Sequence, residues 1–199
     1  MEPKQFSKIL SSTLQVYSRI NLDAKASIYK QAGVLVPLFY KDNTLHILLT
    51  KRTQKVEHHK GEISFPGGAK ESQDNSLLDT ALRESQEEMG ILSSNVQILG
   101  VLDDVFTLAS GFVVTPYVGI IPYPYHFQCN HQEIEEILEI PFSFFFLEKN
   151  YWEGSFYYQN QRIPGYFFQW REDILIWGIT GYIIKNLCRI LKNIGNLLV

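Results

Sequence analysis

Apolar residues form short, regularly spaced runs along most of this chain. Residues 33–40 and 44–51 have the composition of strands, and apolar and polar positions alternate clearly in the second run. The polar residues 41–43 between them predict a hairpin. Further runs of the same kind predict strands at residues 96–105, 112–121, 166–170 and 174–177.

Apolar residues at helical spacing predict helices near both ends of the chain. The first lies within residues 4–28, and its apolar side consists of Phe6, Ile9, Leu10, Leu14, Tyr17 and Ile20. The second spans residues 177–194, with Ile179, Ile183, Leu187 and Ile190 in register. A short helix is expected at residues 142–147. Strands and helices in this mixed order predict an α/β fold in which a mixed β-sheet is flanked by helices.

A third helix is predicted in the middle of the chain, between residues 76 and 90. Ser76 and Asp79 are typical of a capping box, and Gly90 suits the C-terminal end of a helix. The side expected to be buried carries the apolar residues Leu78, Leu82 and Met89.

Three glutamates on this helix point their carboxylates at a single spot opposite the apolar side, because Glu84, Glu87 and Glu88 stand at positions i, i+3 and i+4. Like charges at this spacing cost about 0.2–0.5 kcal/mol per pair on an exposed helix. Hard oxygen ligands that converge from one face are what Mg²⁺ or Mn²⁺ needs. On the helix alone, a metal site and a solvated acidic face are equally open.

The segment before the helix favours the metal site. Residues 65–68 read Phe-Pro-Gly-Gly and predict a strand end followed by a glycine pair. At such a pair the backbone can approach a ligand or a metal without obstruction by side chains. A strand, a glycine loop and an acid-bearing helix make a preorganised metal platform, which a solvated helix would not require.

With Gly68 and residues 83–91, the chain resembles the Nudix hydrolases, whose signature joins a glycine through a spacer to Arg-Glu and Glu-Glu pairs. The spacer here is one residue longer than in the commonest form. The acid expected within it is represented by Asp74 or Glu71. The resemblance implies an α/β/α sandwich with this helix beside the sheet, and metal-dependent hydrolysis of a diphosphate linkage with Mg²⁺ or Mn²⁺ as cofactor.

An upstream motif resembles the coenzyme A pyrophosphatase branch of that family. Residues 48–53 read Leu-Leu-Thr-Lys-Arg-Thr and residues 61–68 read Gly-Glu-Ile-Ser-Phe-Pro-Gly-Gly, in register with the acidic helix. Two positions depart from the branch: Glu57 replaces a usual arginine, and Thr53 stands where Ser or Ala is usual. A cation lost from this region would weaken or alter coenzyme A recognition.

The resemblance implies roles for individual residues. Glu84 and Glu88 are the expected metal ligands, Glu87 is a further or water-mediated ligand, and the carbonyl of the Gly67–Gly68 loop completes the shell. Arg83 orients Glu87. Glu84, Glu87 and Glu133 remain alternative bases for deprotonating water. The expected substrate-binding residues are Lys51, Arg52, Gly61, Phe65, Pro66 and Gly67.

The expected reaction is hydrolysis of coenzyme A or its thioesters to 3′,5′-ADP and 4′-phosphopantetheine or its acyl derivative. An alternative within enzymes is a hydrolase of ADP-ribose, dinucleotides or nucleoside triphosphates, which is favoured if Glu57 marks a lost contact. A catalytically silent nucleotide-binding module is a second alternative. It is disfavoured because every acid of the Arg-Glu and Glu-Glu core is present.

Length and charge limit the number of domains and the kinds of partner that the chain can bind. The 199 residues predict one domain, 1–199, with an N-terminal helical extension (1–28), the two motifs (48–91) and a C-terminal helix (177–194). A net charge of −3 offers no basic field for nucleic acid, and no stretch of about 20 apolar residues could span a membrane. Residues 1–6 lack the apolar core of a signal peptide, so a cytoplasmic location is expected. The resemblance implies a small nucleotide substrate, coenzyme A or an acyl derivative.

The remaining candidates have weaker patterns. Cys129 and Cys188 lack the spacing of a zinc site and are interpreted as buried or incidental thiols. His58 and His59 are assigned a substrate or surface role in preference to metal ligation. The aromatic residues between 142 and 170 form either a stacking surface for adenine or, as we favour, core and subunit interface. Homodimerisation follows as a hypothesis.

Overall fold

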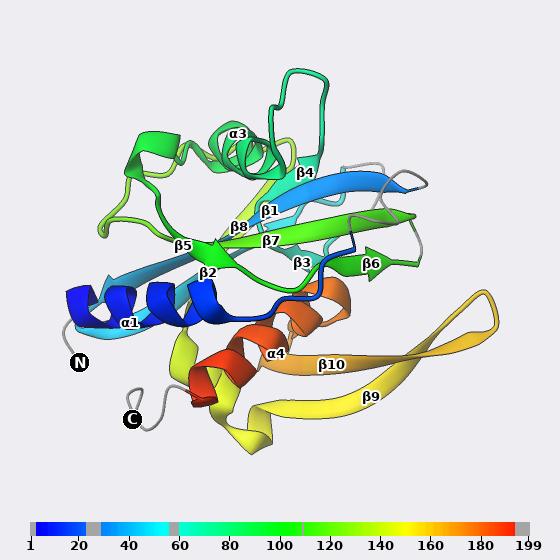
Figure 1. Ribbon diagram of the computed structural model, residues 1–199. Helices are drawn as coiled ribbons and strands as arrows, with labels where there is room; N and C mark the ends of the chain where they lie inside the picture. The colour runs from blue at the N-terminus through cyan, green and yellow to red at the C-terminus, as the bar shows by residue number, and fades with distance from the viewer. Residues whose placement is uncertain (1–2, 23–28, 56–59, 109, 194–199) are drawn as a thin grey trace.

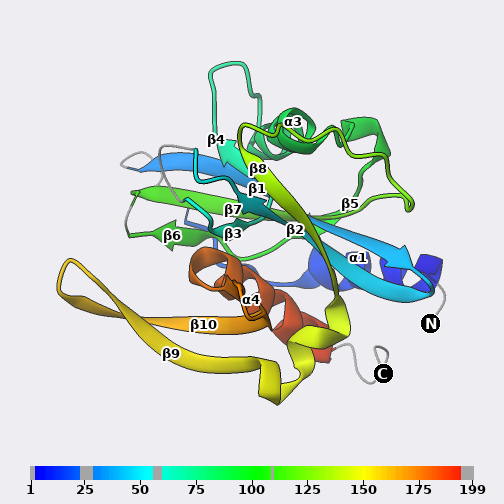
Figure 2. The same ribbon diagram turned by 180° about the vertical axis from the view of Figure 1, so that it is seen from behind.

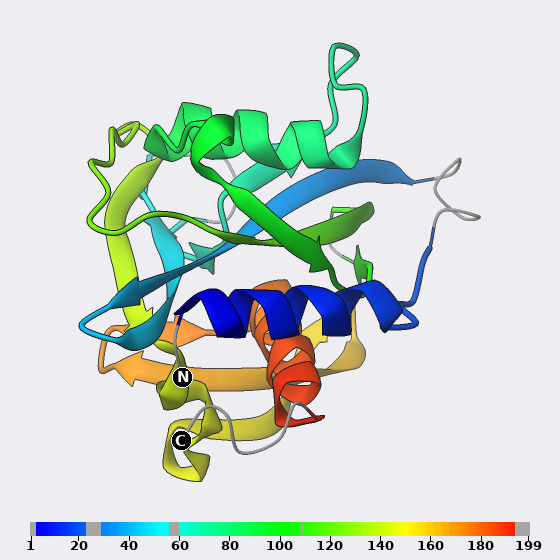
Figure 3. The same cartoon turned by 60° about the vertical axis from the view of Figure 1, so that its left-hand side comes forward.

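The computed structural model describes residues 3–22, 29–55, 60–108 and 110–193, which build four layers (Figure 1). An eight-stranded sheet lies at the centre. Helix α3 (Leu77–Met89) covers one face, while α1 (Pro3–Val16) and α4 (Gly178–Asn193) cover the other (Figures 1 and 3). A three-stranded sheet forms the fourth layer beyond α4. The mixed sheet flanked by helices confirms the predicted fold class, and the extra sheet was not predicted.

The central sheet is mixed because β1 pairs in parallel with β7 and antiparallel with β2. Its main path runs β3-β2-β1-β7-β5, and β4, β6 and β8 pair with β1, β7 and β2 respectively. The bounds are β1 Lys30–Lys41, β2 Thr44–Arg52, β3 Ile63–Ser64, β4 Gly67–Ala69, β5 Gln97–Val101, β6 Val105–Thr107, β7 Phe112–Ile120 and β8 Ile134–Pro141.

Most predicted strands are present, with differences at two places. The expected strand 96–105 is divided into β5 and β6. Between these two strands, the side chains of Asp103 and Asp104 are buried and take part in a hydrogen-bond network, which interrupts the strand. Strand β8 was not predicted. It runs antiparallel beside β2, from the side of α3 toward the 3-10 helix Phe142–Phe146 (Figure 2). That 3-10 helix is the short helix expected at 142–147.

The second sheet has the order β11-β10-β9, and β9 and β10 form a hairpin. Its strands are β9 Tyr151–Tyr158, β10 Gln161–Arg171 and β11 Ile174–Ile176. The sequence predicted part of β10 and all of β11, but not β9. Gln159 and Asn160 turn the hairpin with φ angles of 46° and 63°, as Asp42 and Asn43 do between β1 and β2. Two consecutive residues with positive φ match the twist of the strands that they join.

Helix α1 ends earlier than its apolar pattern predicts. It stops at Val16, and the chain then runs without helix to residue 22, while residues 23–28 lie outside the described part. Hydrogen bonds hold the extended segment: the backbone N–H of Ile20 donates to Asp103 Oδ1 at 2.8 Å, and that of Leu22 donates to Asp104 Oδ2 at 2.8 Å. The expectation that Ile20 lies on a helical apolar side is therefore wrong, and its side chain is exposed.

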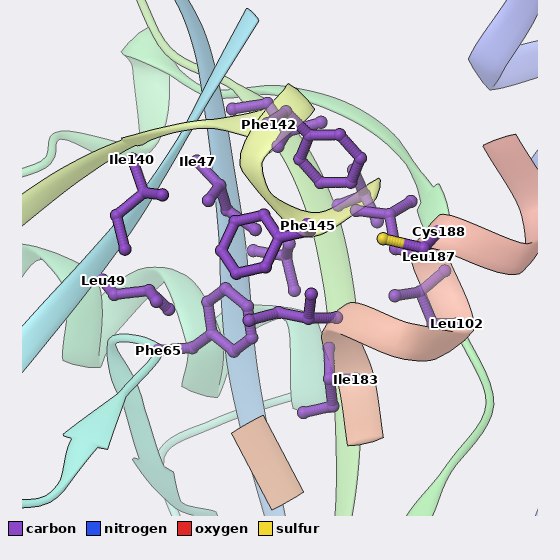
Figure 4. Close-up of a cluster of buried hydrophobic side chains, with 14 of the residues drawn as sticks. Ile47, Leu49, Phe65, Leu102, Ile140, Phe142, Phe145, Ile183, Leu187 and Cys188 are labelled. Atoms are coloured by element: carbon purple, nitrogen blue, oxygen red, sulfur yellow. The ribbon is translucent and has the colours of Figure 1, made fainter. Parts of the chain in front are cut away.

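The hydrophobic core has a part on each face of the central sheet. The larger part joins the sheet to α1, α4 and the second sheet, and Figure 4 shows Phe65 and Phe145 between Leu49 and Ile183 within it. Burial of each such side chain contributes about 1.5–3 kcal/mol. Phe142, Phe144, Phe145 and Phe168 are buried here, which confirms the core interpretation for these rings.

Among the described residues, no helix is long and apolar enough to span a bilayer.

The smaller part of the core attaches α3 to the opposite face of the sheet. Met89 and Ile91 pack there against Phe39 and Leu48. Helix α3 also approaches β1 at Gly33, where an added Cβ would lie 2.1 Å from the carbonyl oxygen of Leu77. The absence of a side chain at this position lets the helix backbone rest directly on the strand.

Candidate active site

Helix α3 begins and ends as its sequence predicts. The hydroxyl of Ser76 accepts a hydrogen bond from the N–H of Asp79 at 3.1 Å, and Gly90 ends the helix with φ 71°. The buried side differs from the prediction. It consists of Thr80, Ala81, Ser85, Glu88 and Met89, whereas Leu78 and Leu82 are only half-buried. The acids therefore do not all lie opposite the packed face, because Glu88 belongs to that face.

Arg83 connects two of the helix glutamates to the loop before the helix. Its Nη1 donates to Glu84 Oε1 at 2.9 Å and to Glu87 Oε2 at 3.1 Å. Its Nε and Nη2 bind both carboxylate oxygens of Asp74 at 3.0 Å, and Nη2 also donates to the carbonyl of Ala69 at 3.2 Å. A guanidinium held by two parallel hydrogen bonds has a fixed orientation. Arg83 is thus a positioning group for Glu84 and Glu87.

Asp74 is the spacer acid that contacts the arginine. Its carboxylate is buried and also accepts hydrogen bonds from the Thr80 hydroxyl and the Glu71 N–H, each at 2.9 Å. The Arg83 guanidinium, together with these two donors, holds the pKa of Asp74 well below its usual range. Glu71 is exposed, and its carboxylate stays 3.8 Å from Arg83. Of the two candidates, Asp74 is the one that occupies this role in the structure.

Glu88 is the most deeply buried acid of the helix, with 4% of its surface exposed. Its Oε2 accepts a hydrogen bond from the N–H of Gly67 at 3.3 Å, and its Oε1 lies 3.6 Å from Nη1 of Arg52. Burial raises the pKa of Glu88 to about 8, although Arg52 and Gly67 favour the ionised form. The nearby carboxylates of Glu84 and Glu133 raise it further. A cation beside this carboxylate would restore its charge.

Glu84 lies against the second glycine of the loop. An added Cβ on Gly68 would stand 2.5 Å from the carboxylate carbon of Glu84. Burial raises the pKa of Glu84, Arg83 opposes that shift, and Glu87 and Glu133 add to it. Gly67 and Gly68 thus contact Glu88 and Glu84 respectively, so the glycine loop and the two carboxylates form one cluster.

The chemistry of this cluster fits a hard divalent cation. Among the described residues, no three acidic, histidine or cysteine side chains converge closely enough to hold a metal ion by themselves. Mg²⁺ usually takes one or two carboxylates and fills its other positions with water and substrate phosphates. Glu84 and Glu88 supply two buried or half-buried carboxylates, and the Gly68 backbone lies beside them. The side chain of Glu87 is 58% exposed and held by Arg83, so it stands at the edge of the cluster.

The two predicted cations at the end of β2 have different surroundings. Arg52 lies within the cluster, between Glu88 and Glu133, and its Nη2 is 3.9 Å from Glu133 Oε2. Its Nε is buried and has no hydrogen-bond partner among the described residues. Lys51 instead forms an ion pair of 2.9 Å with Glu135 and lies 3.9 Å from Asp173. The structure therefore brings Arg52, and not Lys51, to the carboxylates.

The other predicted substrate residues form the backbone of the loop. Phe65 is buried in the core (Figure 4), so its ring supports the loop from beneath. The carbonyl of Pro66 accepts a hydrogen bond from the N–H of Leu35 at 2.9 Å, which fixes the loop to β1. Gly61 has a φ of 70° and is half-buried. Glu57, His58 and His59 lie outside the described residues.

Glu133 joins the cluster from the turn directly before β8, far along the chain. Its Oε1 accepts a hydrogen bond from Asn130 Nδ2 at 3.0 Å. Sequence reasoning named Glu133 but missed Asn130. An asparagine shortly before an acid is typical of a turn, but no pattern in the chain tells which carboxylate its side chain will meet.

Comparison with known proteins finds similar sequences over most of the chain. Residues 29–154 match the NUDIX domain family. The chain is 40% identical over 158 residues to a Pectobacterium atrosepticum protein named uncharacterized Nudix hydrolase NudL, covering 79% of this chain and 81% of that protein. It is 37% identical over 163 residues to the protein of the same name from Yersinia enterocolitica, and the match covers 79% of this chain and 80% of that protein.

A solved structure supports the fold. A MutT/nudix family protein from Enterococcus faecalis superposes with a TM-score of 0.51 at 15% sequence identity, over 96% of this chain and 75% of that one. At this identity the similarity concerns the arrangement of helices and strands only.

Proposed function

Because this chain belongs to the Nudix hydrolase family, we propose that it hydrolyses, in the cytoplasm, the diphosphate linkage of coenzyme A or its thioesters with the help of Mg²⁺ or Mn²⁺. The products would be 3′,5′-ADP and 4′-phosphopantetheine or its acyl derivative. The family supports a hydrolase of diphosphate compounds. The choice of coenzyme A rests on the motif at residues 48–68.

One observation carries this choice: the upstream motif and the acidic helix contact each other. Arg52 from the first half of the motif and Gly67 from the second half both meet the buried carboxylate of Glu88. The two motifs, which are separate in the sequence, therefore contribute to one cluster. A motif at the reaction centre is in a position to contact the substrate beside the bond that breaks.

A diphosphate resists hydrolysis because its negative charge repels an attacking hydroxide. A divalent cation, when bound, supplies positive charge beside the phosphate oxygens and lowers the pKa of the attacking water. Glu84 and Glu88 would hold that cation, and Arg83 keeps Glu84 and Glu87 oriented. The guanidinium of Arg52, whose buried Nε has no partner among the described residues, can donate to a phosphate oxygen.

The reaction exchanges one phosphorus–oxygen bond for another. Water attacks one phosphorus atom, its proton passes to a carboxylate, and the bond between that phosphorus and the bridging oxygen breaks. Glu84, Glu87 and Glu133 are the candidates for that carboxylate, and each lies in or beside the cluster. Glu88 is less suited to this role because it is enclosed by the protein.

The test is product analysis of purified protein. Coenzyme A, ADP-ribose and a nucleoside triphosphate are incubated in parallel with Mg²⁺, Mn²⁺ or a chelator, and the products are separated by chromatography. We expect metal-dependent release of 3′,5′-ADP from coenzyme A. Cleavage of ADP-ribose or the triphosphate alone would reject coenzyme A and favour the alternative that Glu57 suggests.

Two variants accompany this assay. Glu88→Gln should abolish hydrolysis while the protein stays folded, because the amide lacks the charge that a cation requires. Glu148→Gln, at an exposed position, is the matched control and should keep full activity. Full activity of Glu88→Gln would reject its role. A bound nucleotide recovered uncleaved in the presence of Mg²⁺ would support the silent module.

A further inference from the structure

The loop after β7 wraps around the C-terminal end of α3. The N–H of Gln128 donates to the carbonyl of Met89, and the N–H of Asn130 donates to the carbonyl of Glu88, each at 2.9 Å. Tyr125 adds a hydrogen bond from its hydroxyl to the carbonyl of Gly90 at 3.1 Å. The last carbonyls of the helix, which have no partner within it, are thus bound by this loop. The loop therefore has a fixed position relative to Glu88.

The backbone carbonyl and both polar atoms of the Asn130 side chain have hydrogen-bond partners within the turn. Its carbonyl accepts from the N–H groups of Glu133 and Ile134 at 2.9 and 2.8 Å. Its side-chain Oδ1 accepts from the N–H of Gln132 at 3.1 Å, and its Nδ2 donates to Glu133 Oε1 at 3.0 Å. Because a backbone N–H must face the amide oxygen, the amide NH₂ must face the carboxylate. Asparagine carries this acceptor and this donor on two separate atoms of one short side chain.

The same turn is attached to the end of β2. Thr53, which directly follows Arg52, donates from its N–H to the carbonyl of Glu133 at 2.8 Å and from its hydroxyl to the carbonyl of Gln132 at 2.7 Å. The turn is therefore held from the helix on one side and from the upstream motif on the other. These supports fix the backbone of Glu133, while its side chain, which is 41% exposed, has contacts with Asn130 and Arg52.

We propose that Asn130 is a positioning residue that holds the Glu133 carboxylate in the reaction cluster, next to Arg52, which itself lies beside Glu88. This inference rests on the proposed hydrolase function. It assigns to Glu133 a part in the chemical step and to Asn130 the task of aiming it. A misplacement of about 1 Å of a catalytic group lowers a rate by about 100-fold.

The experiment is a double-mutant cycle with Asn130→Asp, Glu133→Gln and the double variant. Asn130→Asp keeps the size and the acceptor for Gln132 but turns a carboxylate toward Glu133. We expect it to lower kcat by about 10-fold or more, with KM changed by less than about threefold. In the double variant, the new carboxylate at position 130 accepts a hydrogen bond from the new amide at position 133. Its thermal stability should recover, while its kcat should stay as low as that of Glu133→Gln.

Other outcomes would overturn the inference. Recovery of kcat together with stability in the double variant would make the role of Asn130 purely structural, as would an unchanged kcat in Asn130→Asp. Mn²⁺ affinity, measured by electron paramagnetic resonance, should be the same in Asn130→Asp and wild type. A large loss would place the effect on α3 instead of Glu133. Asn150→Asp, whose Nδ2 donates to the Phe144 carbonyl away from the cluster in the wild-type protein, is the matched control.

The cycle separates this inference from the choice of substrate. If wild type cleaves ADP-ribose and not coenzyme A, the proposed substrate fails, and the same cycle on ADP-ribose still decides the role of Asn130. If coenzyme A is cleaved and Asn130→Asp keeps wild-type kcat, the substrate proposal stands and the inference fails.

Discussion

The charged side chains of the acidic cluster are held by hydrogen bonds from residues outside helix α3. Asp74 from the preceding loop orients Arg83, Gly67 contacts Glu88, and Asn130 contacts Glu133. The carboxylates repel one another: besides burial, Glu87 and Glu133 raise the pKa of Glu84, and Glu84 and Glu133 raise the pKa of Glu88. The surrounding donors hold these carboxylates together in the structure.

At this scale we expect Asp74→Asn to weaken both the fold and catalysis. Hydrogen bonds to charged groups contribute about 1.5–3 kcal/mol each, and this variant replaces two charge-assisted bonds to Arg83. Because the pKa of Asp74 is lowered by folding, its stabilisation is present above the unfolded value of about 3.9 and is lost as pH falls below it.

The check is urea unfolding of both proteins at pH 7 and near pH 3. The difference in free energy of unfolding should shrink at the lower pH. Asp42→Asn, in the exposed hairpin turn, is the control and should unfold like wild type at both pH values. A difference that stays constant with pH would contradict the assigned role of the carboxylate charge.

A second prediction at the residue scale concerns Gly68→Ala. The new methyl group would displace the Glu84 carboxylate, which is the flexible end of a side chain, so the fold should tolerate it. We expect kcat to fall by about 100-fold with little change in Tm. Gly165→Ala, where the nearest heavy atom would be at 3.4 Å, controls for the substitution itself. Unchanged kcat in Gly68→Ala would show that Glu84 does not need this position.

At the scale of elements, helix α3 is placed by contacts at both of its ends. Its N-terminal turn rests on Gly33 of β1, and its C-terminal end is bound by the loop that carries Asn130. Helical spacing located the helix and both caps. It did not predict that Ser85 and Glu88 are buried while Leu78 and Leu82 are half-exposed, because which side faces the sheet depends on where the helix docks.

Gly33→Ala tests this docking. Its Cβ would collide with the backbone carbonyl of Leu77 at 2.1 Å, and a helix backbone cannot yield as a side chain can. Overpacking of this kind costs about 1–3 kcal/mol. We expect a lower Tm and lower activity together, measured by thermal unfolding and by the product assay. A Tm equal to that of the Gly165→Ala control would mean that α3 can shift without loss.

At the scale of the whole molecule, the second sheet distinguishes this chain from a three-layer sandwich. Its hairpin carries several of the aromatic residues that suggested an interface. Trp152 and Tyr157 are 45% and 76% exposed, whereas the neighbouring Phe168 is fully buried. The rings are thus divided between core and surface, and adenine stacking is not required to explain the buried ones.

Because some of these aromatic rings are exposed, homodimerisation stays a prediction. Light scattering at micromolar concentration should give about twice the chain mass of 23.0 kDa. A Trp152→Glu variant should shift the mass toward that of one chain, because a charge in an apolar interface is unfavourable. Glu148→Gln again serves as the unaffected control. A monomer mass for wild type would remove the support for a dimer.

The sequence by itself determined the mixed fold class and the third helix with its caps, and it predicted the acids and glycines that the structure brings together in one cluster. These features depend on residues close together in the chain, where spacing translates directly into geometry. The end of α1, strand β8 and the second sheet were decided by tertiary contacts, such as the buried Asp103 and Asp104 that hold residues 20–22.

Tertiary structure also decided which of several equivalent residues serve the cluster. Two pairs of residues illustrate this: Asp74 with Glu71, and Arg52 with Lys51. The members of each pair have the same charge and lie close together in the sequence, so the sequence alone does not tell which member contacts the cluster. The fold buries Asp74 against Arg83 and leaves Glu71 exposed, and it places Arg52 beside Glu88 while Lys51 binds Glu135. Distance and burial, which arise only when remote segments pack together, separate these pairs.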